Sequence, residues 1–232
     1  REAEVGGNIG VPALMLEALG PEGTYILEMS SYQLELTVSI TFDVAILLNL
    51  SPDHLERYGG MSDYINAKRL IFHRQTKPRT AVIGVDDGLC HAIANELEID
   101  GEQNVIRISG REIIAGGVYV ENGILIDDTE NSKIPVCSLL ENPCLIGEHN
   151  GQNAAAAYAA AKTVGVAPHA IMACIQSYPG LVHRQEPVSL VDDVAFVNDS
   201  KATNADAAAR AVASYDTVYW IAGGRSKEDG LE

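Results

Sequence analysis

Residues 44–50 read Val-Ala-Ile-Leu-Leu-Asn-Leu, a run that is almost wholly apolar. A strand with one face in water alternates apolar and polar residues, whereas a strand covered on both faces is apolar along its length. Strands of the second kind belong mainly to parallel sheets with helices on both sides. This segment therefore predicts an α/β fold, in which the other elements build or cover such a sheet.

The neighbouring patterns alternate between strand and helix, as an α/β domain requires. The predicted strands are residues 24–27, 80–85, 105–108, 117–121 and 124–126. The predicted helices are residues 62–72, capped by Ser62, and the alanine-rich residues 153–164, ended by Gly165. The last two strands flank Asn122-Gly123, a pair typical of a hairpin turn. We expect a doubly wound, mostly parallel sheet.

The pattern restarts after Tyr178-Pro179-Gly180. A strand over residues 191–197, a helix over 203–214 and a strand over 217–222 resemble the opening of a second, Rossmann-like domain. We therefore expect one domain over residues 1–180 and the start of another over residues 181–232. Because the chain ends without a closing element, we also expect it to be a fragment at both ends.

Composition excludes several classes of protein. With 16 basic and 32 acidic side chains the net charge is −16, which repels nucleic acid and anionic membrane surfaces. No apolar run is long enough to span a bilayer. The four cysteines form no close CxxC pair, which argues against a zinc knuckle and fits reduced thiols in a cytoplasmic protein. No G-x-x-x-x-G-K-[ST] phosphate loop occurs in the sequence.

Two side chains that can bind a metal follow predicted strands. Glu28 comes directly after residues 24–27, and His54 comes shortly after residues 44–50. Ligands of open α/β sheets bind at the carboxyl ends of the strands, so both side chains are expected on one rim. Singly, each is as well explained by a solvated glutamate or a loop histidine; the pair favours a site.

Lys68 shares a face of the helix over residues 62–72 with Ile65 and Phe72. A buried lysine has a lowered pKa and a nucleophilic amine, which can add carbon dioxide to form a carbamate that binds magnesium. Alternatively, the side chain lies along the apolar face and carries its ammonium to solvent. Periodicity alone favours the second interpretation.

Two polar segments suggest a nucleotide site. In residues 198–204 (Asn-Asp-Ser-Lys-Ala-Thr-Asn), Thr203 or Asn204 can cap a helix whose N–H groups attract anions, Lys201 adds a cation, and Asp199 can accept from a ribose. In residues 147–153, Asn150 and Asn153 offer amides that match an adenine edge. Ordinary capped turns would explain both segments. Arg184, at the expected domain junction, either reaches a phosphate or lies at a solvated linker.

Together these segments resemble the Mur ligases, ATP-dependent enzymes that form amide bonds in peptidoglycan synthesis. The resemblance runs almost from end to end. It rests on residues 7–13, 28–34 and 49–58, on Ala67-Lys68, on residues 149–154, on His183-Arg184 and, most specifically, on residues 198–204. Family members have a UDP-sugar domain, a central ATPase domain and a Rossmann-like domain for the incoming amino acid. The chain resembles the central domain after its phosphate loop, followed by the start of the third domain.

The resemblance implies a role for each matching residue. The magnesium and catalytic residues would be Glu28, His54 and carbamylated Lys68. The nucleotide would be bound by Asn150, Asn153, Arg184, Asp199 and Lys201. The substrates would be contacted by Asn8, Ser30, Gln33, Thr203 and Lys227, with Asn8 and His54 at the muramoyl-peptide end and Thr203 and Lys227 at the amino acid.

The implied cofactors are ATP and Mg²⁺, and residues 198–204 point to the branch that adds D-glutamate to UDP-N-acetylmuramoyl-L-alanine through an acyl phosphate. We expect a cytoplasmic monomer with no nucleic-acid or membrane partner. The alternatives are another Mur-type or folylpolyglutamate-type ligase, or a non-catalytic nucleotide-binding relative. Residues 223–227 match the family more loosely than the rest, so the role of Lys227 is the least secure.

Overall fold

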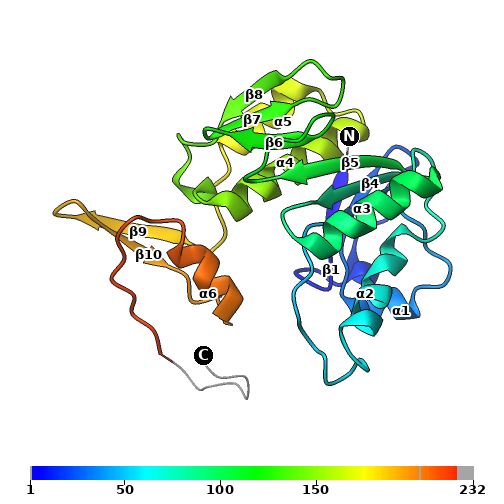
Figure 1. Ribbon diagram of the computed structural model, residues 1–232, viewed down its shortest axis with the longest axis horizontal. Helices are drawn as coiled ribbons and strands as arrows, with labels where there is room; N and C mark the ends of the chain where they lie inside the picture. The colour runs from blue at the N-terminus through cyan, green and yellow to red at the C-terminus, as the bar shows by residue number, and fades with distance from the viewer. Residues whose placement is uncertain (1, 204, 224–232) are drawn as a thin grey trace. The chain divides into compact units, whose positions relative to one another are not determined.

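A computed structural model describes residues 2–203 and 205–223 (Figure 1). The chain forms two compact units. The first unit comprises residues 1–45 and 50–79, and the second comprises residues 46–49 and the chain from residue 80 onward. This division differs from the domain boundary expected at residue 180, which stays a prediction.

The first unit combines a parallel strand pair with short helices. Strand β1 (Ala3–Gly7) pairs in parallel with β2 (Thr24–Glu28), so that Gly7 lies opposite Glu28. The helices are the 3-10 turn η1 (Ala13–Met15), α1 (Ser31–Leu36), α2 (Met61–Arg69) and the 3-10 turn η2 (Leu70–Phe72). Leu34, Tyr64 and Phe72 are buried between these elements. The helix predicted over residues 62–72 is α2 continued by η2. The cap predicted at Ser62 is wrong, because the helix begins at Met61 and its N-cap is Gly60, which has no side chain to cap it.

A sheet of six strands organises the second unit. Its strands are β3 (Val44–Leu47), which begins in the first unit, β4 (Thr80–Gly84), β5 (Asn104–Ser109), β6 (Val118–Glu121), β7 (Ile124–Asp127) and β8 (Ile134–Ser138), in that spatial order. The pairs β4–β5 and β5–β6 are parallel, whereas β6–β7 and β7–β8 are antiparallel. The expected α/β fold is confirmed, with an antiparallel edge added beyond β6. The expectation that residues 44–50 form a strand covered on both faces is wrong, because β3 ends at Leu47, lies at the edge of the sheet, and leaves Ile46 37% exposed.

Helices cover this sheet. They are α3 (Gly88–Asp100), the 3-10 turn η3 (Pro143–Leu145), α4 (Glu148–Thr163) and α5 (Pro168–Gln176). Both α3 and α4 pack on β4 and β5, and every residue of β4 is buried, as a strand covered on both faces requires (Figure 1). The alanine-rich helix begins at Glu148 rather than at residue 153, because the polar residues 148–152 already form its first turn.

An ion pair with a buried carboxylate fixes α4 to the sheet, while its lysine partner Lys162 is 31% exposed. The carboxylate of Asp127, at the end of β7, is only 3% exposed. It accepts hydrogen bonds from the ammonium of Lys162 at 2.6 Å and from the hydroxyl of Tyr158 at 2.9 Å, both on α4. Thr129 donates to the same carboxylate through its backbone N–H and its hydroxyl. The C-terminal half of α4 is thereby held against β7.

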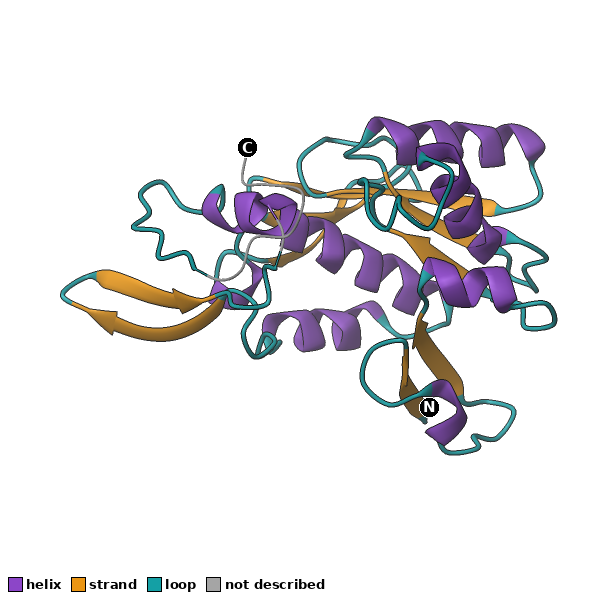
Figure 2. Ribbon diagram, turned by 90° about the horizontal axis from the view of Figure 1, so that it is seen from below, coloured by secondary structure: helices purple, strands orange, loops and turns teal. Residues whose placement is uncertain are grey.

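The chain continues into a hairpin and a helix. Strands β9 (Glu186–Val191) and β10 (Val194–Asn198) are antiparallel, and α6 (Ala205–Val212) follows them (Figure 2). The strand predicted over residues 191–197 is confirmed for residues 194–197, which belong to β10, but its predicted start is wrong, because the chain reverses at Asp192 and Asp193 with φ angles of 48° and 63°. Aspartate tolerates this left-handed conformation, and apolar neighbours on both sides hid the turn.

The strand predicted over residues 217–222 is also wrong, since these residues belong to no strand of the described chain. A strand needs a neighbour for its backbone hydrogen bonds, and no ladder among the described residues includes them. The hairpin prediction at Asn122-Gly123 is confirmed, because both residues have positive φ between β6 and β7. None of the described helices is sufficiently long and apolar to cross a membrane.

Candidate functional site

The ends of β1 and β2 bring two predicted site residues together in the first unit. The backbone N–H of Asn8 donates to the carbonyl oxygen of Glu28 at 2.8 Å. Gly7 makes this approach possible, because its φ is 115° and a Cβ there would stand 2.3 Å from the same carbonyl oxygen. Both Asn8 and Glu28 are exposed. They are neighbours at one strand end, whereas the rim that the sequence predicted for Glu28 and His54 stays a prediction.

Ser30 and Gln33 have a structural role in this fold. The backbone N–H of Gln33 donates to the Ser30 hydroxyl at 3.3 Å, and the backbone N–H of Ser30 donates to the Gln33 side-chain oxygen at 3.0 Å. This reciprocal pair is a capping box, which satisfies N–H groups at the start of α1. Their predicted contact with substrate is not tested by these bonds and stays a prediction.

His54 lies in an exposed loop of the same unit. Its φ of 53° is left-handed, and its side chain is 48% exposed. The ring nitrogens face two carboxylates, Nε2 at 3.6 Å from Asp53 and Nδ1 at 3.9 Å from Glu56. The imidazole also lies against the ring of Tyr32, with the ring centroids 5.4 Å apart. His54 is thus available to a ligand and in contact with the helix α1 that follows Glu28.

Lys68 lies beside the buried face of α2. Tyr64 and Ala67 are the buried residues of this helix, whereas Lys68 is half-buried. Its ammonium lies 5.7 Å from the centroid of the Tyr64 ring, which places the charge near an aromatic face. This position is compatible with both interpretations given above, so the carbamate stays a prediction.

The unmodified side chains do not by themselves make a magnesium site. Among the described residues, no group of three or more His, Cys, Asp and Glu side chains is placed to hold a metal ion. Magnesium prefers six oxygen ligands, and the pair Glu28 and His54 offers one carboxylate and one imidazole. A further oxygen donor, such as a carbamate on Lys68, would be needed. The magnesium assignment therefore stays a prediction.

In the second unit, the predicted adenine residues lie on the first two turns of α4. The amide of Asn150 donates to the carbonyl oxygen of Ile146 at 2.9 Å, and the amide of Asn153 donates to the side-chain oxygen of Asn150 at 3.4 Å. The two amides therefore share one face of the helix. Asn153 is exposed and Asn150 is half-buried, so groups on both remain accessible to a ligand.

A contact through His149 joins this helix to the segment that carries the other predicted nucleotide residues. The side-chain Nε2 atoms of His149 and the buried Gln185 lie 2.7 Å apart. Burial lowers the pKa of His149, the charge of Arg210 lowers it further, and Asp199 opposes the change. A neutral imidazole nitrogen can accept a hydrogen bond from the Gln185 amide, which explains the short contact.

Gln185 then connects to the turn after β10. Its backbone N–H donates to the Asp199 carboxylate at 3.1 Å, and the backbone N–H of Lys201 donates to the carbonyl oxygen of His183 at 3.0 Å. Arg184, Asp199 and Lys201 are thus held in one small region, which the His149 contact joins to the start of α4. The contact between His149 and Gln185 thus connects the two segments that carry the five residues predicted for the nucleotide, and their binding role stays a prediction.

The two residues predicted to contact the amino acid are less well placed. Thr203 is exposed, and α6 begins at Ala205, so its capping position is residue 204, which lies outside the described residues. Lys227 also lies outside the described residues. Their predicted contact with an amino acid stays a prediction.

Sequence reasoning missed a hydrogen-bond network around Asp86, near the carboxyl ends of β4 and β5. The Asp86 carboxylate accepts from the hydroxyl of Ser109, from the backbone N–H of Gly110 at 3.0 Å and from the amide of Gln152 at 2.9 Å. Gln152 belongs to α4, so this hydrogen-bond network positions the part of the helix that carries Asn150 and Asn153. The signal in the sequence was an Asp shortly after the mostly apolar segment over residues 80–85.

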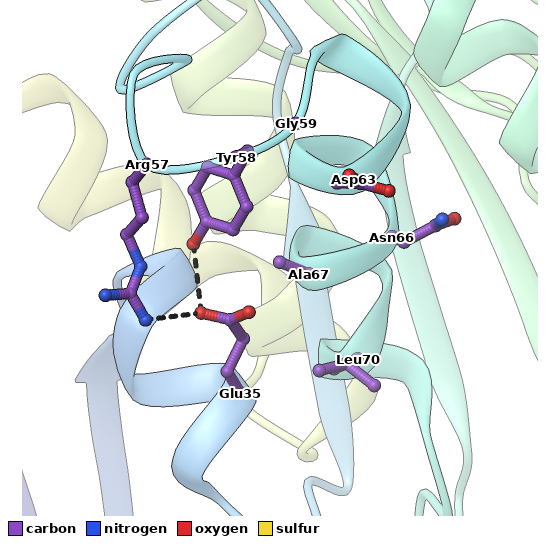
Figure 3. Close-up of a pocket in the computed structure, with 8 residues that line it drawn as sticks. All are labelled: Glu35, Arg57, Tyr58, Gly59, Asp63, Asn66, Ala67 and Leu70. Carbon is purple, nitrogen blue, oxygen red and sulfur yellow. Dashed lines mark hydrogen bonds and ion pairs between the residues drawn. The ribbon is translucent and has the colours of Figure 1, made fainter.

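Sequence reasoning also missed a cluster in the first unit. The guanidinium of Arg57 donates to the Glu35 carboxylate at 2.9 Å, and the Tyr58 hydroxyl donates to the same oxygen at 3.3 Å (Figure 3). The hydrogen bond to Glu35 raises the pKa of Arg57, so this side chain stays charged. These three residues border an open pocket of about 470 Å³. It is also lined by Gly59, Asp63, Asn66, Ala67 and Leu70.

Comparisons with known proteins agree with these observations. Residues 2–161 match the family model of the Mur ligase middle domain. A protein of Paramagnetospirillum magneticum named UDP-N-acetylmuramoylalanine–D-glutamate ligase is 51% identical over 97% of this chain and 48% of its own length. A protein of Caulobacter vibrioides with the same name is 48% identical over 100% of this chain and 49% of its own length. The chain thus spans about half the length of the curated relatives it matches.

Solved structures agree in fold. The MurF ligase of Thermotoga maritima in complex with ADP is 17% identical with a TM-score of 0.62, covering 92% of this chain and 50% of its own. An FPGS–AMPPCP–folate complex is 19% identical with a TM-score of 0.55, covering 83% of this chain and 46% of its own. At this level of identity the likeness supports the fold alone.

Proposed function

Because the chain belongs to the Mur ligase family, we propose that its protein is an ATP-dependent ligase that joins D-glutamate to UDP-N-acetylmuramoyl-L-alanine in peptidoglycan synthesis. The observation that carries this proposal is the 51% identity, over almost the whole chain, to relatives with that name. We further propose that it works as a cytoplasmic monomer, since both substrates are soluble metabolites.

The nucleotide site lies in the second unit under this proposal. Asn150 and Asn153 bind adenine through their amides, which offer the donor and the acceptor that an adenine edge needs. Asp199 accepts from the ribose, while Arg184 and Lys201 contact phosphates. One contact supports this assignment: the hydrogen bond between His149 and Gln185 joins α4, which carries the two asparagines, to the segment that carries Arg184, Asp199 and Lys201.

The chemistry proceeds in two steps. The carboxylate of the UDP-linked substrate attacks the γ-phosphoryl group of ATP to give an acyl phosphate and ADP. The amine of D-glutamate then attacks the acyl carbon and expels inorganic phosphate through a tetrahedral intermediate. Bound Mg²⁺ would neutralise the phosphate oxygens that must approach one another. Glu28, His54 and carbamylated Lys68 would hold the metal ion. Asn8 and His54 would face the muramoyl-peptide end of the UDP-linked substrate, and Ser30 and Gln33 would contact the substrate as well.

Binding of D-glutamate requires local positive groups. The ligand brings two carboxylates to a chain whose net charge is −16, so the overall field repels it. We assign its recognition to Thr203 and Lys227. Hydrogen bonds that involve a charged group each contribute about 1.5–3 kcal/mol, which corresponds to roughly ten- to hundredfold in affinity.

The test is phosphate release by the full-length protein with ATP, UDP-N-acetylmuramoyl-L-alanine and one amino acid at a time. We expect release with D-glutamate and only background release with L-lysine, diaminopimelate or L-alanine. Preference for one of those amino acids would move the protein to another branch of the family. ATP binding without substrate-dependent release would instead indicate a non-catalytic nucleotide-binding protein.

A further inference from the structure

Four side chains of the first unit form a cluster beside His54, which we call the arginine clamp: Tyr32, Glu35, Arg57 and Tyr58. The guanidinium carbon of Arg57 lies 4.4 Å from the centroid of the Tyr32 ring and 5.8 Å from that of Tyr58. The two tyrosine rings are nearly parallel, at 9° with centroids 6.2 Å apart. Glu35 accepts from both Arg57 and Tyr58, which fixes the guanidinium against the rings (Figure 3).

The clamp holds the turn that carries His54. His54 has a left-handed φ of 53°, a conformation that is uncommon for a residue with a Cβ. The backbone N–H of Arg57 donates to the carbonyl oxygen of His54 at 3.1 Å and closes this turn. The Arg57 side chain then anchors the closed turn on Tyr32, whose ring also contacts the His54 imidazole. Arg57 therefore fixes His54 through its backbone and through its side chain.

The other end of the clamp is attached to the strand that ends at Glu28. Tyr32 and Glu35 are three residues apart and lie on one face of α1. The Ser30–Gln33 capping box fixes the start of this helix, two residues beyond Glu28. The clamp thus connects the loop of His54 to the end of β2, although 26 residues separate His54 from Glu28 in the sequence.

We propose that Arg57, held by Glu35 and stacked on Tyr32, is a positioning residue that fixes the His54 imidazole relative to Glu28 for the ligase reaction. This inference rests on the proposed function. Arg57 acts through His54 and does not need to touch a substrate. If Arg57 had a structural role alone, its loss would lower the stability of the protein. If it is a positioning residue, its loss changes the placement of the His54 imidazole.

The test compares four variants of the full-length protein. Arg57→Ala removes the clamp, Arg57→Lys keeps a cation above the Tyr32 ring, and Tyr32→Leu removes the ring from the other side. Arg79→Ala removes an arginine from the same unit outside the clamp. The measurements are kcat, KM for ATP, Tm and the ¹H–¹⁵N signals of the His54 ring.

We expect Arg57→Ala and Tyr32→Leu to lower kcat roughly ten- to hundredfold, the size of effect that follows a misplacement of about 1 Å. KM for ATP should change less than about twofold, because the residues assigned to the nucleotide lie in the second unit. Arg57→Lys should recover at least part of kcat. The His54 signals should move in Arg57→Ala and Tyr32→Leu and stay in place in Arg79→Ala.

Three results would overturn the inference. The first is a kcat of Arg57→Ala within about twofold of the wild type, and the second is unchanged His54 signals in that variant. The third is a loss of kcat that follows a loss of Tm and is not relieved in Arg57→Lys, which would indicate general destabilisation. If the wild-type protein lacks ligase activity, the proposed function fails, while the His54 signals still decide whether Arg57 positions the imidazole.

Discussion

Lys162→Met removes the ammonium that faces the buried Asp127 carboxylate in the second unit. Burial works to raise the pKa of Asp127, but hydrogen bonds from Lys162, Thr129 and Tyr158 outweigh burial and lower it. Without Lys162, the carboxylate is left buried with less compensation. Removing one partner of a buried pair costs about 3–5 kcal/mol. Because Thr129 and Tyr158 still donate, we expect the lower end of this range, about 3 kcal/mol.

For a chain of this size, a loss of about 3 kcal/mol corresponds to a fall of roughly 6–12 °C in Tm. Urea unfolding followed by circular dichroism, with a thermal scan beside it, measures both quantities. Lys133→Met is the matched control, because Lys133 is an exposed lysine of the same unit. We expect that control to stay within about 0.5 kcal/mol of the wild type. The double variant Asp127→Asn with Lys162→Met should recover part of the loss, since no charge then remains buried.

The dependence on pH gives an independent check. A carboxylate whose pKa is lowered by folding stabilises the native state above its unfolded value and loses that contribution as the pH falls through its folded value. The difference between the wild type and Lys162→Met should therefore be full near pH 7. It should narrow as the pH falls towards and through 3.8, the ordinary value for aspartate. A loss below about 1 kcal/mol at pH 7, or a difference that grows on acidification, would refute the account of this pair.

Three further predictions follow from the site. Gly110→Ala would place a Cβ 1.8 Å from the Glu148 carbonyl oxygen, so we expect its free energy of unfolding in urea to fall by about 2–3 kcal/mol. Gly88→Ala, where a Cβ would have no atom within 4 Å, is the control and should be near neutral, and equal effects of the two substitutions would contradict the reasoning. In the full-length protein, Lys68→Ala should abolish phosphate release and acetate should partly restore it, whereas full activity without acetate would rule out the carbamate. Calorimetry with Mg-ATP should detect no micromolar binding to residues 1–232 alone, because no phosphate loop occurs in this sequence.

The residues that we propose for the nucleotide could be selected from the sequence because they stand beside regular elements, mostly in polar segments. Asn150 and Asn153 open an alanine-rich helix, and Asp199 and Lys201 follow an apolar strand. Local patterns of this kind predict which side chains are available. They cannot show that His149 and Gln185, 36 residues apart, join the two segments. That contact depends on packing between elements distant in the chain.

The arginine clamp shows the same limit from another direction. The sequence singled out His54 by its residue type and its place after an apolar segment, but Arg57 and Glu35 look like ordinary surface charges, and 22 residues separate them. Only the fold brings the Arg57 guanidinium to the Glu35 carboxylate and to the Tyr32 ring. Likewise, the reversal at Asp192 and Asp193 was hidden, because apolar residues flank this short turn on both sides.

The sequence by itself determined the fold class, the family and the chemical types at the site, because these depend on periodicity and on residues close together in the chain. The tertiary structure decided which of those residues meet. It placed Asn8 beside Glu28 at one strand end and joined Ser30 and Gln33 in a capping box. It also brought the Asp86 carboxylate to the Gln152 amide of α4. The reason is physical: a side chain has a role only through its neighbours in space, and the packing of distant segments chooses those neighbours.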